Sequence, residues 1–353
     1  MQFLIVKTSS LGDIIQAFGV LTYLHRKFPA ASIDWVVDER FASIVAAHPL
    51  VRRAISFDIK QFKRRFRDQT FRHGICRFVR ALRDQKYDAV FDLQGNCKSG
   101  AITFLSRGRE KVGFGRKSVR EWPNIMATRT RFEIPRRVNI RLQYTTLIQK
   151  FYNDSSPAVM EGVRFKMSLE EQYQLKVLLS SSELGNKCRV MVCPGSKWIN
   201  KQLPLETLAD FMKKIEVALH CSFLLVWGGE EEKQMCHSLW QRFSHCSVVV
   251  DRLEVPLWQN LMCEADLVIA MDSSALHLCG TTSTPSFSIF GPTSPEIFKP
   301  PGTAHAAYLG CCPYNKSFDK QCPLLRSCST GACIRDISAD QLFHHFLQTI
   351  KFN

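Results

Sequence analysis

The chain has 353 residues, of which 45% are hydrophobic and 22% are charged, and its formal net charge is +15. This composition is typical of a globular protein large enough for two domains, and it excludes a disordered or fibrous chain. No segment approaches the roughly 18 apolar residues of a membrane helix, and the N-terminus lacks the pattern of a signal peptide, so we expect a cytoplasmic protein.

The N-terminal half alternates short apolar runs with helical patterns. Strands are predicted at Phe3–Val6, Ile33–Val37 and Tyr87–Phe91, and helices at Ile14–Leu24 and Phe71–Leu82. This alternation is typical of a parallel sheet with connecting helices. We therefore predict an open α/β domain over residues 1–155.

The loop after the first strand is the most informative segment. Lys7–Gly12 joins that strand to a helix expected to open at Asp13, where open α/β proteins bind phosphate or place a catalytic carboxylate. The glycine-rich signatures GxGxxG and GxxxxGK[ST] are both absent from this loop, so we do not expect it to bind a dinucleotide or ATP. A single carboxylate at such a turn suggests a general base. The alternative is that Asp13 only caps the helix.

Positive charge is concentrated in the first half of the chain. Residues 1–150 hold 29 Lys and Arg against 12 Asp and Glu, a balance of +17, whereas residues 151–353 hold 18 against 20. Ten of the cations fall within residues 51–80. This asymmetry predicts contact with a polyanion such as a nucleic acid, an anionic lipid or a phosphorylated substrate. The alternative is a basic face that serves solubility alone.

Residues 156–170 are predicted to be a linker, after which the α/β alternation restarts over residues 171–353. Strands are expected at Cys188–Cys193, Phe223–Trp227, Ser247–Val250, Leu267–Met271 and Ser286–Phe290, and helices at Leu205–Leu219, Glu230–Phe243, Pro256–Ala265 and Ala275–Gly280. The expected architecture is two open α/β domains with a cleft between them. We include the possibility that the last helix packs against the first domain.

Polar loops directly follow several strands of the second half. Residues 194–197 read Pro-Gly-Ser-Lys and precede Lys201, residues 228–232 read Gly-Gly-Glu-Glu-Glu, and residues 272–274 read Asp-Ser-Ser and precede His277. These loops fall on one edge of the predicted sheet, and a small loop, a lysine and a Ser-rich helix start suit a diphosphate. The alternatives are structural: helix caps, favourable charges at a helix start and a buried histidine.

The chain contains 14 cysteines. Nine of them, from Cys76 to Cys279, fall mostly within apolar elements, which predicts buried free thiols in a reducing compartment. The other five cluster near the C-terminus: Cys311, Cys312, Cys322, Cys328 and Cys333. Their spacings contain no C-x₂-C pair, so we expect free thiols and no metal, with a structural zinc site as the alternative.

Several segments together carry a family resemblance. They are KTSSLGDI (Lys7–Ile14), YDAVFDLQGNCKS (Tyr87–Ser99), PGSKWINKQLP (Pro194–Pro204), VWGGEEE (Val226–Glu232), MDSSALHL (Met271–Leu278) and FGPTSP (Phe290–Pro295). In this order they resemble the ADP-heptose:lipopolysaccharide heptosyltransferases, and among these the type I enzymes, which add the first heptose to the Kdo region. The likeness covers nearly the whole chain. At two positions the chain departs from the family pattern: Ser274 stands where the family usually has Gly, and Gly19 stands where it often has Pro.

The resemblance implies a GT-B fold, with two Rossmann-like domains that face a cleft and bind the acceptor (N-terminal) and the nucleotide sugar (C-terminal). It implies an inverting transfer of L-glycero-D-manno-heptose from ADP-heptose to Kdo-lipid A, with no metal or other cofactor. Asp13 matches the catalytic base of the family. The matching donor-binding positions are Ser196, Lys197, Lys201, Glu232, Leu253, Asp272, Ser273, Ser274 and His277, and the matching acceptor-binding positions are Lys60, Lys63, Arg64 and Arg120.

Such an enzyme would act at the cytoplasmic face of the inner membrane of a Gram-negative bacterium, where its basic half would meet an anionic lipid surface. One alternative within the family is heptose transfer to a later core position or to a protein. An alternative of another class is a nucleic-acid-binding protein that uses residues 51–80. The lead interpretation includes no nucleic acid, because the chain has no aromatic-rich motif such as RNP1.

Overall fold

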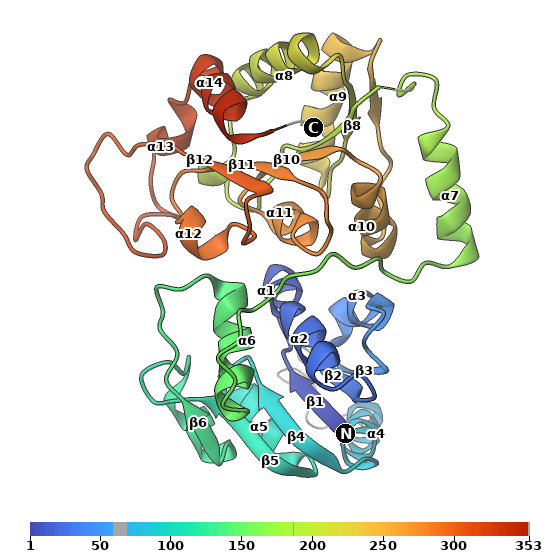
Figure 1. Cartoon of the computed structure of the whole chain (residues 1–353), viewed down its shortest axis with the longest axis vertical. Helices are drawn as coiled ribbons and strands as arrows, with labels where there is room; N and C mark the ends of the chain where they lie inside the picture. The colour runs from blue at the N-terminus through green and yellow to red at the C-terminus, as the bar shows by residue number, and fades with distance from the viewer. Residues whose placement is uncertain (59–68, 186, 352–353) are drawn as a thin grey trace. The chain divides into compact units, whose positions relative to one another are not determined.

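The computed structural model describes residues 1–58, 69–185 and 187–351 (Figure 1). The chain divides into two compact units, Met1–Glu161 and Gly162–Asn353. The division falls within residues 156–170, which we assigned to a linker. Each unit contains one six-stranded sheet, and every strand pair in both sheets is parallel. The predicted class, two open parallel α/β sheets, is therefore confirmed.

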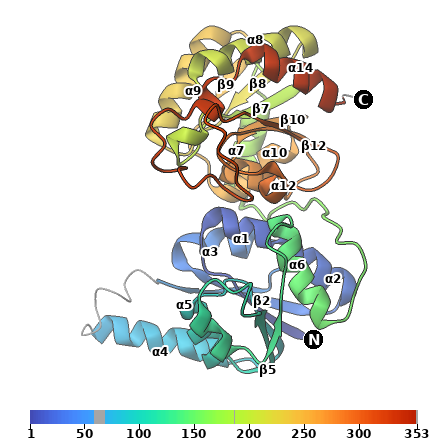
Figure 2. The same ribbon diagram turned by 90° about the vertical axis from the view of Figure 1, so that its left-hand side faces the viewer.

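The N-terminal sheet has the strand order β3-β2-β1-β4-β5-β6. Its strands are β1 (Gln2–Val6), β2 (Ser32–Asp38), β3 (Arg53–Phe57), β4 (Tyr87–Asp92), β5 (Gly108–Phe114) and β6 (Thr130–Phe132). Its helices are α1 (Leu11–Ala17), α2 (Gly19–Lys27), α3 (Ala42–Ala47), α4 (Gln69–Arg83), α5 (Cys97–Leu105) and α6 (Ile140–Phe151), with short 3₁₀ turns at Glu39–Phe41 and Trp122–Ala127. Helices α1, α2 and α6 lie on one face of the sheet, and α4 and α5 lie on the other (Figure 2).

The first helical region differs from its prediction in two ways. The helix begins at Leu11 with Ser10 as its N-cap, so Asp13 is its third residue and does not open it. The predicted helix Ile14–Leu24 is also interrupted at Phe18, which ends α1 and precedes α2. Gly19 starts α2 in close packing, because a Cβ at this position would lie 2.8 Å from Sδ of Met160.

The C-terminal sheet has the strand order β12-β11-β10-β7-β8-β9. Its strands are β7 (Arg189–Cys193), β8 (Ser222–Leu225), β9 (Ser247–Val249), β10 (Leu267–Met271), β11 (Ser286–Phe290) and β12 (His305–Leu309). Its helices are α7 (Leu169–Leu179), α8 (Leu205–Leu219), α9 (Glu230–Phe243), α10 (Val255–Cys263), α11 (Ser274–Cys279), α12 (Pro295–Phe298), α13 (Ala332–Arg335) and α14 (Ala339–Thr349), with a 3₁₀ turn, η4, at Ile199–Lys201.

The two sheets share one topology. In each, the first strand of the unit lies beside the second and the fourth, which is the order of dinucleotide-binding folds. The strand order therefore reverses between β1 and β4 in the first sheet, and between β7 and β10 in the second. Ligands of open α/β sheets bind beyond the carboxyl ends of the strands at such a reversal. A ligand is therefore expected at the loops after these four strands.

Helix α14 completes the core of the C-terminal unit. The ring of Phe346 is fully buried, and its centroid lies 5.9 Å from that of Phe211 in α8 and 5.4 Å from that of Phe287 in β11. These apolar contacts hold the last helix on its own unit, whereas we had allowed it to pack back on the first. Among the described residues, no helix is long and apolar enough to cross a bilayer. All 14 cysteines are free thiols.

Candidate active site

An ion pair joins the two loops at the strand reversal of the C-terminal sheet. Lys201 lies in η4 after β7, and Asp272 directly follows β10. The Lys201 ammonium lies 2.5 Å from Oδ2 of Asp272, and the two side chains are 14% and 4% exposed. Since β7 and β10 are neighbours in the sheet, the topology itself brings these distant residues together.

Asp272 has two further polar neighbours. The hydroxyl of Thr293, in the loop after β11, donates a hydrogen bond of 2.6 Å to Oδ2, and Nε2 of His277 in α11 lies 3.9 Å from Oδ1. Burial raises the pKa of Asp272, but the charges of Lys201 and His277 and the hydrogen bonds outweigh it, so the pKa is lowered overall. Asp272 is thus a buried carboxylate held in its ionised form.

The serines predicted in this region lie around the same pair. The hydroxyl of Ser196 donates a 3.4 Å hydrogen bond to the backbone carbonyl of Asp272. The side-chain amide of Gln202 donates a 2.6 Å hydrogen bond to the backbone carbonyl of Ser196. Ser273 is the N-cap residue of α11, yet its side chain makes no capping hydrogen bond. The structural alternative of a side-chain cap therefore does not account for Ser273, and Ser274 follows it as the first residue of the helix.

Glu232 folds back over the loop after β7. Its Oε2 accepts a 2.7 Å hydrogen bond from the backbone N–H of Gly228, and a Cβ at Gly195 would overlap its side chain. A side chain at position 195 would therefore force the Glu232 carboxyl group to move. The arrangement places the carboxylate of α9 beside the loop that contains Ser196.

Two of the predicted donor residues, Lys197 and Leu253, are exposed to solvent at least in part. The Lys197 side chain is exposed, and its ammonium lies 5.6 Å from the ring centroid of Trp198. Leu253 is partly exposed in the loop between β9 and α10. Thr293 was absent from our site prediction although its segment, FGPTSP, carried part of the resemblance.

Asp13 lies at the strand reversal of the N-terminal sheet. Its Oδ2 accepts hydrogen bonds from the backbone N–H and the hydroxyl of Ser10, at 3.0 and 3.1 Å. These bonds complete a capping box at the start of α1, so a structural role for Asp13 is present. The side chain is only partly buried, and one carboxylate can both cap a helix and accept a proton.

Neighbouring elements fix the loop that contains Asp13. The backbone N–H groups of Thr8 and Ser9 donate to Oε1 of Gln94, which follows β4, at 3.2 and 3.3 Å. Buried Lys7 lies 4.9 Å above the ring of Tyr144 in α6. We had not predicted roles for Gln94 and Tyr144, although Gln94 stood within a quoted motif.

Arg120 is the one predicted acceptor residue within the described ranges. Its side chain is exposed, and its backbone N–H donates a hydrogen bond of 3.2 Å to the carbonyl of Gly95. Gly95 has a φ of +68°, a conformation that favours glycine. The pKa of the Tyr144 phenol is raised, mainly by burial. The charge of Asp13 also raises this pKa, whereas the charges of Lys7 and Arg120 lower it. Arg120 and Asp13 therefore both lie within electrostatic reach of the Tyr144 phenol.

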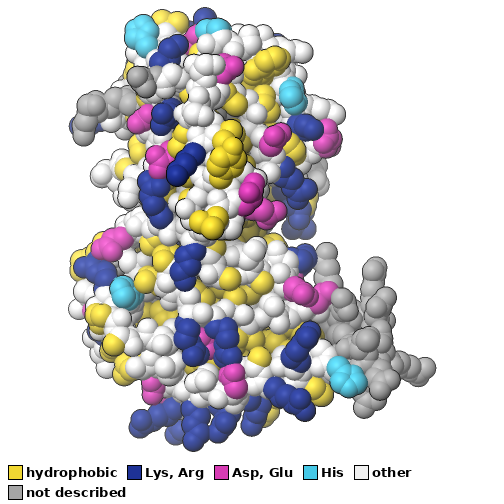
Figure 3. Space-filling model, turned by 90° about the vertical axis from the view of Figure 1, so that its right-hand side faces the viewer, with side chains coloured by type: hydrophobic (Ala, Val, Ile, Leu, Met, Phe, Trp, Pro, Cys, Tyr) yellow, Lys and Arg dark blue, Asp and Glu magenta, His cyan; other side chains and the backbone are white. Residues whose placement is uncertain are grey.

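The basic segment 51–80 is only partly available for a ligand. Arg52 and Arg53 pair with buried Asp34 at 2.7 and 2.9 Å, so two of its cations are structural. Lys60, Lys63 and Arg64 lie outside the described residues. Elsewhere on the N-terminal unit, Figure 3 shows Lys and Arg side chains gathered at one end.

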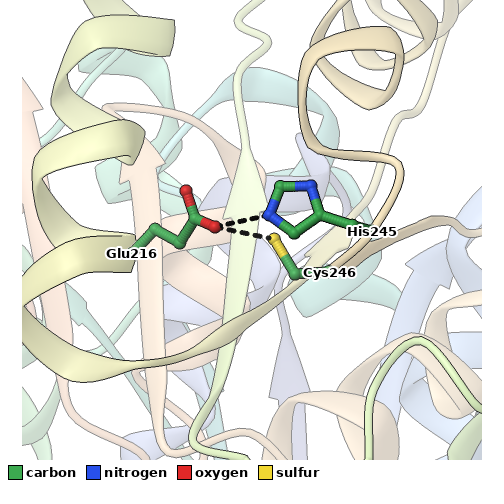
Figure 4. Close-up of side chains that lie close together, drawn as sticks. All are labelled: Glu216, His245 and Cys246. Atoms are coloured by element: carbon green, nitrogen blue, oxygen red, sulfur yellow. Dashed lines mark hydrogen bonds and ion pairs between the residues drawn. The ribbon is translucent and has the colours of Figure 1, made fainter.

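A second polar cluster lies at the far end of the C-terminal sheet strands. Glu216 in α8 pairs with His245 at 2.6 Å, and the Cys246 thiol lies 3.6 Å from the same oxygen (Figure 4). These three residues form a group whose ligand atoms lie within 4.8 Å of one another. Glu216 also pairs with Lys213 at 2.8 Å, so its charge is already balanced by a neighbouring ammonium.

Comparison with known proteins matches most of the chain to one family. Residues 75–327 match the model of glycosyltransferase family 9 (heptosyltransferase). A lipopolysaccharide heptosyltransferase 1 from Pseudomonas aeruginosa is 28% identical over 310 residues, covering 84% of this chain and 80% of the relative. The enzyme of the same name from Campylobacter coli is 29% identical over 309 residues, covering 83% and 84%.

A solved structure shows the same fold over the whole chain. The Escherichia coli heptosyltransferase WaaC with ADP matches with a TM-score of 0.78 at 22% identity, covering 99% of this chain and 100% of that one. This likeness identifies the two-sheet architecture as the predicted GT-B fold. Together with the family match over residues 75–327, it leads to one conclusion: the chain belongs to glycosyltransferase family 9, the heptosyltransferase family, and is a glycosyltransferase enzyme.

Proposed function

We propose that this enzyme transfers L-glycero-D-manno-heptose from ADP-heptose to Kdo-lipid A, the Kdo region of the lipopolysaccharide inner core. The observation that carries the proposal is the buried Lys201–Asp272 pair at a strand reversal, in a chain whose relatives are named lipopolysaccharide heptosyltransferase 1. A donor of this class is further supported by a solved E. coli neighbour, which is a complex with ADP-2-deoxy-2-fluoro heptose.

The C-terminal unit has the groups that this donor requires. Lys201 supplies positive charge for the diphosphate, and Asp272 accepts hydrogen bonds from sugar hydroxyls. Ser273 and Ser274 offer hydroxyls and backbone N–H groups at the start of α11, and Glu232 accepts from the ribose. We propose that this charge stabilises the departing ADP without a metal ion at the diphosphate. Residues 171–353 then form the donor domain.

The N-terminal unit has the groups for the acceptor side. In an inverting transfer one base takes the proton of the acceptor hydroxyl while its oxygen attacks the anomeric carbon in line. We assign this role to Asp13, whose orientation is fixed by Ser10 and, through the loop, by Gln94. Arg120, with Lys60, Lys63 and Arg64, would bind the anionic groups of the acceptor. Residues 1–155 then form the acceptor domain.

The proposed location follows from the charge of this unit. Residues 1–150 carry a balance of +17, and clustered cations near an anionic leaflet each contribute on the order of 1 kcal/mol of attraction. We propose that the enzyme binds peripherally to the cytoplasmic face of the inner membrane. The family match makes the chain an enzyme, which favours a glycolipid acceptor over a nucleic acid as the polyanion.

A direct transfer assay tests the proposal. The purified protein is incubated with ADP-heptose and Kdo-lipid A, and the products are analysed by mass spectrometry. We expect the lipid to gain one heptose. Parallel reactions contain an acceptor that already carries the first heptose, or a bacterial protein extract. Transfer to one of these, with none to Kdo-lipid A, would instead support a later core position or a protein acceptor.

A further inference from the structure

Four large apolar side chains are exposed on two neighbouring elements of the N-terminal unit. Helix α5 exposes Phe104 (69%) and Leu105, and the 3₁₀ turn η3 (Trp122–Ala127) exposes Trp122 (54%) and Met126 (77%). Two other large apolar side chains of this unit are exposed within the described residues, and both lie at its ends. Single exposed apolar residues are normal, whereas a group of them marks a contact surface. We call these four residues the apolar surface.

The two elements pack side by side. Gly100, in the middle of α5, faces η3, because a Cβ there would lie 3.3 Å from the Cα of Asn124. Phe104 follows Gly100 by about one helical turn and therefore lies on the same side of α5. At the start of the helix, the backbone N–H of Cys97 donates a hydrogen bond of 2.8 Å to the carboxylate of Glu121, the residue that precedes η3. The turn therefore runs alongside α5, and the exposed side chains of both elements belong to one surface.

Cations surround the apolar surface. Residues 97–131 contain nine Lys and Arg against two Asp and Glu, and eight of the nine basic side chains are exposed. The ammonium of Lys111 lies 5.6 Å from the ring centroid of Phe104 and donates a hydrogen bond of 2.7 Å to its carbonyl. The guanidinium of Arg83, in α4, donates a hydrogen bond of 2.9 Å to the carbonyl of Leu105. The partner of this surface should therefore be both apolar and anionic.

An anionic bilayer has both properties. Tryptophan favours the boundary between headgroups and acyl chains, aliphatic side chains enter the boundary below it, and long basic side chains extend to the lipid phosphates. A nucleic acid stacks on aromatic rings but has no apolar layer to cover Leu105 and Met126. The cores of protein interfaces are depleted in lysine. The composition of the surface therefore favours lipid over either of these partners.

The C-terminal unit provides an internal contrast. Helix α7 exposes Leu169 (84%) and Tyr173 (66%), which is a comparable amount of apolar side chain. The first turn of α7, however, contains Glu170 and Glu171. These carboxylates would be repelled by an anionic leaflet. Apolar exposure combined with positive charge therefore distinguishes the surface on α5 and η3.

The apolar surface lies next to the residues that we assigned to the acceptor side. Arg120 lies two positions before η3, and its backbone N–H donates a hydrogen bond of 3.2 Å to the carbonyl of Gly95 in the loop after β4. The same loop contains Gln94, whose side chain accepts hydrogen bonds from the loop of Asp13. A bilayer that contacts η3 would therefore lie close to Arg120.

We propose that the apolar surface inserts into the headgroup region of a bilayer that contains anionic phospholipids, with the surrounding cations on the lipid phosphates. This surface is separate from the basic segment 51–80. Insertion would present Arg120 at the level of the headgroups, where the anionic sugars of a glycolipid lie. The insertion stands on the surface itself, whereas its use in acceptor binding rests on the proposed function.

Vesicle binding of the full chain tests the surface. The protein is sedimented with vesicles of phosphatidylglycerol and phosphatidylcholine in equal parts, or of phosphatidylcholine alone, all free of lipopolysaccharide. We expect at least about tenfold stronger binding to the anionic vesicles. Trp122→Ser/Met126→Ser should weaken that binding at least about tenfold, because two large apolar side chains no longer leave water. The matched control is Leu169→Ser/Tyr173→Ser, which should bind like the wild type.

Tryptophan fluorescence distinguishes insertion from attraction by charge alone. Brominated phosphatidylcholine, mixed with phosphatidylglycerol, quenches a tryptophan that enters the bilayer. We expect quenching in the wild type and loss of most of it in Trp122→Phe, which keeps an aromatic ring and should stay bound to the vesicles. The chain contains six tryptophans, so the difference between the two proteins isolates the one at position 122.

Three results would overturn the proposal: no binding of the wild type to anionic vesicles, binding without quenching, or equal losses in the two double variants. If the surface binds a second copy or a nucleic acid instead, Trp122→Ser/Met126→Ser should abolish a dimer or a mobility shift with duplex DNA, and the wild type should leave vesicles unbound. These results are independent of the transfer assay, since the vesicles contain neither donor nor acceptor. For the acceptor step, the same variant should transfer normally to a soluble Kdo acceptor without acyl chains and more slowly to Kdo-lipid A in vesicles. Equal rates on Kdo-lipid A would refute that step alone.

Discussion

The ammonium group of Lys201 lies 2.5 Å from a carboxylate oxygen of Asp272, which is 71 positions further along the chain. Asp272 is almost fully buried and Lys201 is mostly buried, and such a pair owes its stability to each partner neutralising the other. A donor diphosphate would therefore compete with Asp272 for Lys201. The pair is a charged site that is already assembled before the anion arrives, so the donor does not have to order it.

Replacing Lys201 by Met should weaken both folding and donor binding. The change leaves the buried Asp272 charge beside Thr293 and His277 but without its ammonium partner, and breaking a buried pair costs about 3–5 kcal/mol. Calorimetric titration with ADP-heptose should show at least tenfold weaker binding, or about 1.4 kcal/mol. Lys197→Met removes a charge from the same loop, where the side chain is exposed, and should cost less than about 0.5 kcal/mol of stability. Equal losses of donor affinity in both variants would contradict a site centred on Lys201.

Stability at acidic pH should depend on the same pair. The pKa of Asp272 is lowered in the folded state, and that of an unfolded Asp is about 3.9. The carboxylate therefore contributes stability that is fully present above the unfolded value and is lost as the pH falls through the folded value. Between about pH 5 and pH 3 the melting temperature of the wild type should fall more steeply than that of the neutral variant Lys201→Met/Asp272→Asn. If the melting temperatures of the two proteins fall in parallel with pH, the Lys201–Asp272 pair does not cause the acid sensitivity.

Two substitutions separate the capping role of Asp13 from the proposed catalytic one. Asp13→Asn keeps an oxygen that accepts from the Ser10 N–H but removes the base, so the transfer rate should fall by at least about 100-fold while donor affinity is kept. Ser10→Ala removes its hydroxyl bond to the carboxylate and should cost about 1 kcal/mol of stability with nearly normal turnover. If Asp13→Asn turns over as fast as Ser10→Ala, Asp13 is a cap only.

A methyl group at Gly195 should displace Glu232. The added Cβ of Gly195→Ala would overlap the Glu232 side chain, and such overpacking costs about 1–3 kcal/mol. Gly229→Ala is the matched control, because nothing lies within 4 Å of a Cβ there. Urea denaturation should show that the double variant Gly195→Ala/Glu232→Ala regains most of the stability lost in Gly195→Ala. If the double variant loses as much stability as the two single variants together, the strain at position 195 does not come from Glu232.

Prediction from the sequence succeeded for the central strands, whereas of the four edge strands it found only β9 and missed β3, β6 and β12. The central strand Leu267–Met271 is a continuous apolar run that is buried on both faces, and its bounds were predicted correctly. Strands β3 and β5 contain Arg53 and Glu110 and lie away from the centre of their sheet, so their apolar pattern is weak. Arg53 fits within a strand only because Asp34 and Asp84 accept its guanidinium bonds, which no local pattern records.

Prediction of the site was limited for a related reason. Residues that follow strands directly, such as Asp272, could be placed at the sheet edge from their order in the chain. Thr293 acts through a single hydroxyl in a loop, and nothing in its local sequence indicates that it contacts Asp272. Gln94 likewise stabilises the loop of Asp13 from the loop after another strand, β4. Contacts between loops depend on the order of the strands in the sheet, which the local sequence pattern does not record.

The burial of Phe346 has a consequence for synthesis. Helix α14 is translated after every strand of its sheet, and until it docks, Phe211 and Phe287 face no partner on that side. The second half of the protein therefore cannot bury its aromatic core on the ribosome as early as the first half can, since domains generally fold in the order in which they emerge. This unit would depend most on chaperones that shield apolar surface during translation.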